Sequence, residues 1–157
     1  MTNREEISEQ VDILLALYKH NAELGRHHQL LRERTTNIII VLIGALIGFI
    51  LYDKKVDNFD IYPSLFISFL GFFGAIWCRK YHERYAWYMH RGSVYRDKLD
   101  ELFPDLKIIE LKDKADKETA ENYKIITKIK LTNLWVTAHL IIGCLGLWLS
   151  IISYNAK

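Results

Sequence analysis

The chain has 157 residues, of which 50% are hydrophobic and 25% charged, with a formal net charge of only +2. That length allows one domain or one compact membrane unit. The charges are gathered in blocks that long apolar stretches separate, which excludes a soluble globular domain and a secreted protein. The composition therefore predicts a small all-α, polytopic membrane protein.

Three stretches of the chain contain no charged residue: 35–52, 61–78 and 131–156. A helix crosses the hydrocarbon core of a bilayer with roughly 20 apolar residues. Each stretch is long enough to span, the first two with help from their flanks. The predicted division is an N-terminal cytoplasmic helix 1–34, transmembrane helices 35–52, 61–78 and 131–154, an external loop 53–60, a cytoplasmic helical region 79–130 and an external C-terminus 155–157.

The positions of Lys and Arg predict the orientation. Five precede the first span, 2 lie in the loop 53–60, 13 lie in 79–130 and 1 follows the third span. Lys and Arg of short loops accumulate on the cytoplasmic side, so we expect the N-terminus on the cytoplasmic side of the membrane and the C-terminus outside. The first residues lack the basic and then apolar pattern of a cleavable signal peptide.

The first two spans are expected to continue as helices beyond the membrane. No proline lies between Arg4 and Tyr52, and Gly25 is the only glycine before Gly44. One helix from the cytosol into the first span is predicted; the alternative is a break at Gly25 followed by a separate surface helix. The second span is expected to continue to about Leu102.

The return to the third span is expected to be helical as well. Phe103, Pro104 and Asp105 form a predicted turn after the second helix. From about Ala115 a second long helix is predicted to run through Ile129 into the third span.

Small and polar residues inside the spans indicate where helices meet. Gly44 and Gly48 form a GxxxG pattern, which lets helix backbones approach closely; it fits a homo-oligomer and intramolecular packing equally well. Two more small-residue notches come from Gly71, Gly74, Gly143 and Gly146. Asn37 and His139 are polar positions within spans. An imidazole such as His139 is costly in lipid unless it faces protein or water, so it makes either an interhelical hydrogen bond or part of a water-lined path.

The sequence contains no motif of a known catalytic chemistry. It has no glycine-rich phosphate loop, HExxH, paired-cysteine motif or GxSxG. His20, His27 and His28 share one helical stripe, but a polar helix face explains them better than a metal. Cys78 and Cys144 lie inside spans and are expected to be free thiols. We therefore predict no enzyme activity, cofactor or metal.

The segment after the second span combines cations with aromatic residues. Tyr81, Tyr88 and Tyr95 are spaced by seven, and so are Arg84, Arg91 and Lys98, which gives two neighbouring helical stripes. Guanidinium groups pair with phosphates and aromatic rings stack on bases, so the segment suits an anionic ligand with flat bases. In the alternative, the tyrosines pack on the N-terminal helix and the cations meet anionic lipid headgroups.

The layout of the chain resembles two groups of bacterial membrane proteins. It consists of a cytosolic helix, two close spans, an aromatic and basic helix over 77–96 that ends at Lys98 to Pro104, a return segment at 123–128 and a third span. This organisation is similar to the RipA-type octameric membrane proteins and to the SLATT-like, Hailong-type effectors found beside nucleotidyltransferases in anti-phage defence. SLATT-type proteins commonly have two spans, so the third span is a departure.

The resemblance implies a homo-oligomeric ion channel or membrane-permeabilising effector of the bacterial cytoplasmic (inner) membrane. A cytosolic nucleotide or short nucleic acid, made by a partner nucleotidyltransferase, would gate it. The expected ligand contacts are Arg84, Arg91 and Arg96, with Tyr88 as a stacking surface. Asn37, Gly44, Gly48 and His139 are the candidate pore or helix-packing positions. The rival interpretation is a non-conducting oligomeric scaffold that senses stress or recruits a partner.

Overall fold

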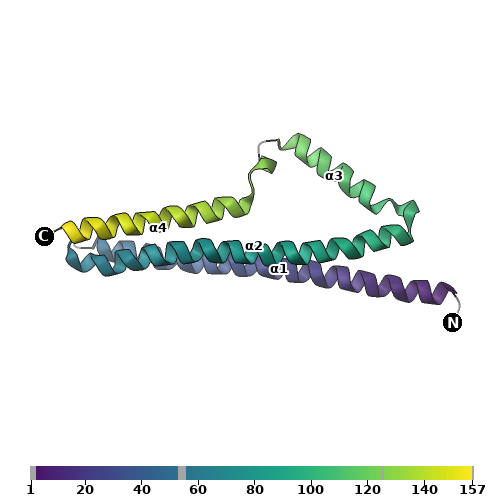
Figure 1. The fold of residues 1–157 in the computed structure, drawn as a ribbon, viewed down its shortest axis with the longest axis horizontal. Coiled ribbons are helices and arrows are strands. Elements are labelled where there is room, and N and C mark those ends of the chain that lie inside the picture. The colour runs from purple at the N-terminus through teal and green to yellow at the C-terminus, as the bar shows by residue number, and fades with distance from the viewer. Residues whose placement is uncertain (1–2, 53–55, 125, 157) are drawn as a thin grey trace. The chain divides into compact units, whose positions relative to one another are not determined.

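The computed structural model describes residues 3–52, 56–124 and 126–156. Over these ranges the chain is helical and contains no strand, so the all-α prediction is confirmed. The α-helices are α1 (Asn3–Ile50), α2 (Ile61–Leu102), α3 (Ile108–Asn122) and α4 (Leu131–Asn155), and the short 3₁₀ helices are η1 (Asn58–Asp60), η2 (Pro104–Leu106) and η3 (Ile126–Lys128) (Figure 1).

Three helical segments are long and apolar enough to cross a membrane, as the uncharged stretches predicted. They lie in α1, in the segment Asn58–Leu102 that contains α2, and in α4. Residues 53–55 of the predicted external loop lie outside the described residues. The orientation of the spans stays a prediction.

The chain divides into two compact units. One unit comprises 1–29 and 83–129, and the other comprises 30–82 and 130–157. We call the first the polar unit and the second the apolar unit, after their composition. Both α1 and α2 contribute residues to each unit.

The helix α1 passes through Gly25 without interruption, so the predicted continuous helix is confirmed and the alternative break at Gly25 is wrong. In the polar unit Gly25 marks a close approach of α1 to α2. A Cβ at this position would lie 3.3 Å from Met89 Sδ and 3.5 Å from the Tyr85 ring. Packing against α2 therefore offsets the roughly 1 kcal/mol that a glycine costs inside a helix.

The prediction of one long helix from Ala115 into the third span is wrong. The helix α3 begins at Ile108 and ends at Asn122, and α4 begins only at Leu131. Tyr123 leaves the helical region with φ −124° and ψ 46°. The segment 123–130 contains three isoleucines and one threonine, and β-branched side chains lose rotamer freedom in a helix. Local propensity is therefore too weak to carry one helix through this segment.

The start of α3 is held by a side chain from α2. The Asp100 carboxylate accepts hydrogen bonds from the backbone N–H groups of Ile108, at 2.6 Å, and Ile109, at 3.4 Å. These N–H groups have no partner within their own helix, and a carboxylate at a helix N-terminus also meets the positive end of the helix dipole. Asp100 thus fixes the connection between α2 and α3, which contains η2.

In the apolar unit, aliphatic residues pack between helices. The buried cluster consists of Ile39, Ile43 and Ile50 from α1 with Ile67 and Leu70 from α2. The helix α4 lies alongside α2 (Figure 1), and the contact between these two helices is made by glycines and not by large side chains.

Two of the three small-residue notches are filled within the chain. A Cβ on Gly71 would lie 2.3 Å from the backbone nitrogen of Gly143, and one on Gly146 would lie 2.4 Å from that of Ser68. These glycines thus bring the backbones of α2 and α4 into contact. A Cβ on Gly44 or Gly48 would meet nothing within 4 Å. The glycine face of α1 is therefore open in the single chain.

Candidate functional site

In the polar unit, α2 presents two arginines on either side of an exposed tryptophan. Arg84, Trp87 and Arg91 follow one another at spacings of three and four, which places them on one helix face. The Arg84 Cζ atom lies 5.6 Å from the centroid of the Trp87 ring, and that of Arg91 lies 4.9 Å from it. Trp87 is 46% exposed. We call these three residues the Arg–Trp–Arg face.

This arrangement suits a phosphorylated ligand that carries a base. The cation–π contacts hold both guanidinium groups beside the ring, where their outward N–H groups can pair with phosphate oxygens. The exposed part of the indole offers a surface on which a base can stack. The predicted residues Arg84 and Arg91 thus share one face, but Trp87 was missed because only spacings of seven were considered. Trp87 lies three residues after Arg84 and four residues before Arg91, and this helical spacing could have identified it from the sequence.

Tyr88 lies next to the Arg–Trp–Arg face, with its ring centroid 5.0 Å from that of Trp87 and an interplanar angle of 56°. Its ring stacks on His28 of α1, with centroids 5.4 Å apart and an interplanar angle of 15°. One face of the Tyr88 ring is therefore covered by protein, as expected if the tyrosines pack on the N-terminal helix. The role of Tyr88 as a ligand-stacking surface stays a prediction.

The positive charge of Arg84, on the Arg–Trp–Arg face, affects the pKa of His28 in this stacked pair. Burial lowers the pKa of His28, and the neighbouring His27 and Arg84 lower it further. Near neutral pH His28 is therefore neutral, which avoids a third positive charge close to Arg84.

Arg96 lies beside a small crevice rather than on the Arg–Trp–Arg face. Its guanidinium group forms an ion pair with Asp97 at 2.6 Å. The crevice has a volume of about 60 Å³, whereas small-molecule sites usually enclose roughly 300–1,000 Å³. It is lined by Tyr18, Ala22, Tyr88, Met89, Gly92, Ser93 and Arg96. Arg96 thus lines this crevice and not the Arg–Trp–Arg face, and the crevice is too small for a nucleotide.

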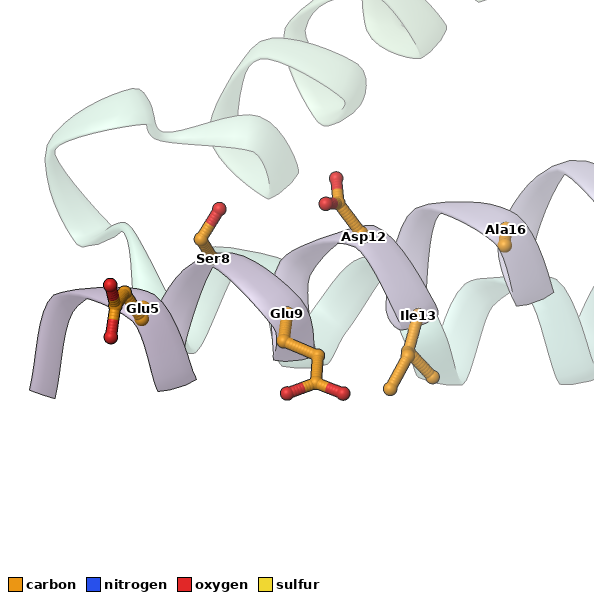
Figure 2. Close-up of a pocket in the computed structure, with 6 residues that line it drawn as sticks. All are labelled: Glu5, Ser8, Glu9, Asp12, Ile13 and Ala16. Carbon is orange, nitrogen blue, oxygen red and sulfur yellow. The ribbon is translucent and has the colours of Figure 1, made fainter. Parts of the chain in front are cut away.

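A second hollow lies on the first turns of α1 and is acidic. All the residues that line it belong to that one helix: Glu5, Ser8, Glu9, Asp12, Ile13 and Ala16 (Figure 2). Figure 2 shows Ser8 and Asp12 on one side of the helix and Glu9 and Ile13 on the other. Three carboxylates around an open surface repel phosphates, so this hollow does not suit the expected ligand.

In the apolar unit, His139 joins three helices. Its side chain is only 1% exposed, and its Nε2 atom lies 3.5 Å from Thr36 Oγ1 of α1. The same hydroxyl lies 3.6 Å from Cys78 Sγ of α2. A Cβ on Gly74 would lie 2.3 Å from the imidazole Nδ1. His139 therefore makes the interhelical contact that was one of its two interpretations, and the water-lined path stays a prediction.

The other predicted span positions lie on the outside of α1. Asn37, Gly44 and Gly48 are exposed, and their spacings of seven and four put them on one helix face. Cys78 is buried and Cys144 exposed, both as free thiols. Among the described residues, no three His, Cys, Asp or Glu side chains are arranged to hold a metal, and His20, His27 and His28 are no exception.

Together these features define an all-helical protein with three helices able to span a membrane and an exposed Arg–Trp–Arg face on one of them. Comparison of the chain with known protein families, curated proteins and solved structures finds no match. The resemblance to RipA-type and SLATT-like proteins therefore stays a prediction.

Proposed function

We propose that this chain is a homo-oligomeric membrane effector of bacterial anti-phage defence. It acts as an ion channel or membrane-permeabilising protein that a cytosolic nucleotide or oligonucleotide controls, and a partner nucleotidyltransferase supplies that ligand. The observation that carries the proposal is the exposed Trp87 ring between the guanidinium groups of Arg84 and Arg91. Few surface features combine base stacking and phosphate pairing in this way.

The open face of α1 supports assembly of several copies. Gly44 and Gly48 have room for a second backbone, and Asn37 on the same face carries an amide for which lipid offers no hydrogen-bonding partner. Close approach of small residues and hydrogen bonds of polar side chains drive helix association in membranes. In an oligomer, the Arg–Trp–Arg faces of neighbouring copies would add their positive fields.

Gating requires that the ligand bind the open and closed states with different affinities. The helix α2 carries the Arg–Trp–Arg face and a candidate span without an interruption. A shift of the face on ligand binding can therefore reach the membrane segment through continuous helical backbone.

Ligand binding is tested with the double variant Arg84→Glu and Arg91→Glu. The matched control is Lys112→Glu and Lys114→Glu, which makes the same charge change on α3. We expect purified protein in detergent to bind fluorescent oligonucleotides, the test variant to lose binding at least tenfold, and the control to retain most of it. Binding that survives the arginine change, with oligomer size unaltered, would falsify this face as the ligand site.

Conduction is tested in bacteria that express the chain with and without the genes beside it. A voltage-sensitive dye reports membrane potential. Depolarisation by the chain alone, or only with an active nucleotidyltransferase, supports the channel. A steady potential under both conditions and during phage infection favours the non-conducting scaffold instead.

A further inference from the structure

The buried side of α4 is polar or small along the whole helix. Most exposed residues of α4 are large and apolar, but each of its buried residues is a glycine, a serine, a threonine or a histidine. The buried residues are Thr132, His139, Gly143, Gly146, Ser150 and Ser153. From Thr132 to Ser153 the helix rises about 31 Å, which is close to the roughly 30 Å of a bilayer's hydrocarbon core. A polar line therefore runs through the full length of this candidate span.

The side of α2 that faces α4 continues this pattern. A Cβ on Gly146 would lie 2.8 Å from the carbonyl oxygen of Ser64. One on Gly71 would lie 2.6 Å from Gly143 Cα, and these contacts set the antiparallel register of the two helices. We call the two facing rows the polar seam. Its buried residues on the side of η1 and α2 are Asp60, Ser64, Ser68, Gly71 and Gly74.

Two buried polar atoms of the seam have no hydrogen-bonding partner among the described residues. They are Ser64 Oγ and His139 Nδ1, and the two residues are 0% and 1% exposed. A helix interface in lipid can be made by small residues alone, and a buried hydroxyl without a partner is unfavourable. The packing of α2 against α4 therefore does not explain Ser64.

One end of the seam is negative. Asp60 is 7% exposed, and its carboxylate accepts a hydrogen bond from the backbone N–H of Asp57. The helix α4 contacts η1, and the register places the C-terminal end of α4 there, which carries the negative end of the helix dipole. A cation is therefore favoured over an anion at this end, and one carboxylate balances a single positive charge.

The seam is closed near its middle. The backbones of Gly71 and Gly143 touch there, and the short distance from a Gly71 Cβ to Gly143 Cα leaves no room for water. Hydroxyl groups and Asp60 lie on one side of this contact, and His139 lies on the other. Polar and ionisable residues within spans commonly line routes for ions and water, so separation of α2 from α4 at the glycines would connect the two parts.

We propose that the polar seam is a route for monovalent cations within each chain, which the contact of Gly71 with Gly143 closes. Asp60 selects the cation at one end, and the seam hydroxyl groups replace part of its water. This inference rests on the conducting activity in the proposed function, and it locates the path between α2 and α4 instead of between the α1 helices of neighbouring copies.

The test measures how fast introduced cysteines react with a membrane-impermeant, cationic methanethiosulfonate in liposomes. The full-length chain carries alanine in place of both native cysteines. The seam variants are Ser64→Cys and Ser150→Cys. Their controls are Leu65→Cys and Ile151→Cys, which lie at nearly the same depth but are exposed on the outside of the helices.

Each cysteine is measured with and without Gly71→Val. A valine has no room against Gly143, so it must move the two helices apart. In the opened chain we expect the seam cysteines to react at least tenfold faster than their controls. Asp60→Asn should slow the cationic reagent severalfold but not an anionic one, whereas Asp57→Asn, three residues away and exposed, should change neither.

Seam cysteines that react no faster than their controls in the opened chain would overturn the route and leave a dry packing contact. If Gly71→Val fails to insert, Gly71→Ala makes the same separation to a smaller extent. The rates do not depend on the proposed ligand. Unreactive seam cysteines in a chain that depolarises cells would therefore refute the route alone, whereas reactive ones in a chain that never does would support the route and refute the effector activity.

Discussion

Alanine substitutions of the span glycines are expected to have opposite effects in different helices. On Gly71 or Gly146 an added Cβ would lie 2.3–2.4 Å from a backbone nitrogen of the neighbouring helix. To reach ordinary van der Waals contact the two backbones must separate by about 1 Å. On Gly44 or Gly48 the same methyl group meets nothing within 4 Å.

The magnitudes follow from two competing terms. Alanine is more favourable than glycine inside a helix by roughly 0.5–1 kcal/mol. Overpacking a close contact costs typically about 1–3 kcal/mol. For Gly71→Ala and Gly146→Ala the second term is larger, so we expect a net destabilisation of roughly 1–2 kcal/mol. For Gly44→Ala and Gly48→Ala only the first term acts within one chain, so these variants are neutral or slightly more stable.

The assay is reversible unfolding in mixed micelles, followed by tryptophan fluorescence under conditions that keep the chain monomeric. The four single variants differ only in position, and each adds one methyl group to a helix. Equal destabilisation by all four, or none by Gly71→Ala and Gly146→Ala, would refute the packing of α2 against α4 as described.

Other expected outcomes concern single polar contacts. Asp100→Ala removes the cap of α3 and should cost about 1 kcal/mol, seen as faster hydrogen exchange at the Ile108 amide. Thr36→Val removes the hydroxyl between helices and should lower stability in micelles by roughly 1 kcal/mol, whereas unchanged unfolding would show that the contact contributes nothing. Because Arg84 helps lower the pKa of His28, Arg84→Gln should raise that pKa, as measured by NMR. Since the lowered pKa means that the unfolded chain takes up the proton first, stability should be constant above the ordinary value of 6.5, fall as the pH drops from 6.5 toward the native pKa of His28, and level off below that pKa, where both states are protonated.

The spans were predictable because the bilayer imposes a length and excludes charge. The uncharged stretches 35–52, 61–78 and 131–156 therefore located three helices without any knowledge of packing. Helix continuity was harder to predict, because it depends on differences of about 1 kcal/mol. Gly25 is helical because α2 packs against it, whereas the segment 123–130 contains no proline or glycine and still ends a helix. A single sequence does not reveal which local weakness tertiary contacts will offset.

The candidate site was predictable in composition but only in part in geometry. Seven-residue spacing correctly grouped Arg84 with Arg91. It did not show that Trp87 lies between them, that the Tyr88 ring is also stacked on His28, or that Arg96 lies beside a crevice. Residues 100° apart on a helix belong to different faces, and which face the partner helix covers depends on where α1 packs. The stack of His28 on Tyr88 settles that question in the structure.

The span glycines divide into those that contact a neighbouring helix and those that do not, and this division indicates how copies of the chain would assemble. Four of the six span glycines, those at 71, 74, 143 and 146, are used where α2 meets α4, so they are not available to a second chain unless that contact opens. The remaining two, Gly44 and Gly48, lie on α1 beside Asn37. We therefore expect leucine at Gly44 and Gly48 to reduce oligomer size or conduction while leaving the fold of the single chain intact. An unchanged oligomer with unchanged conduction would remove α1 from the interface, and assembly would then have to use the exposed aromatic and aliphatic faces of α2 or α4.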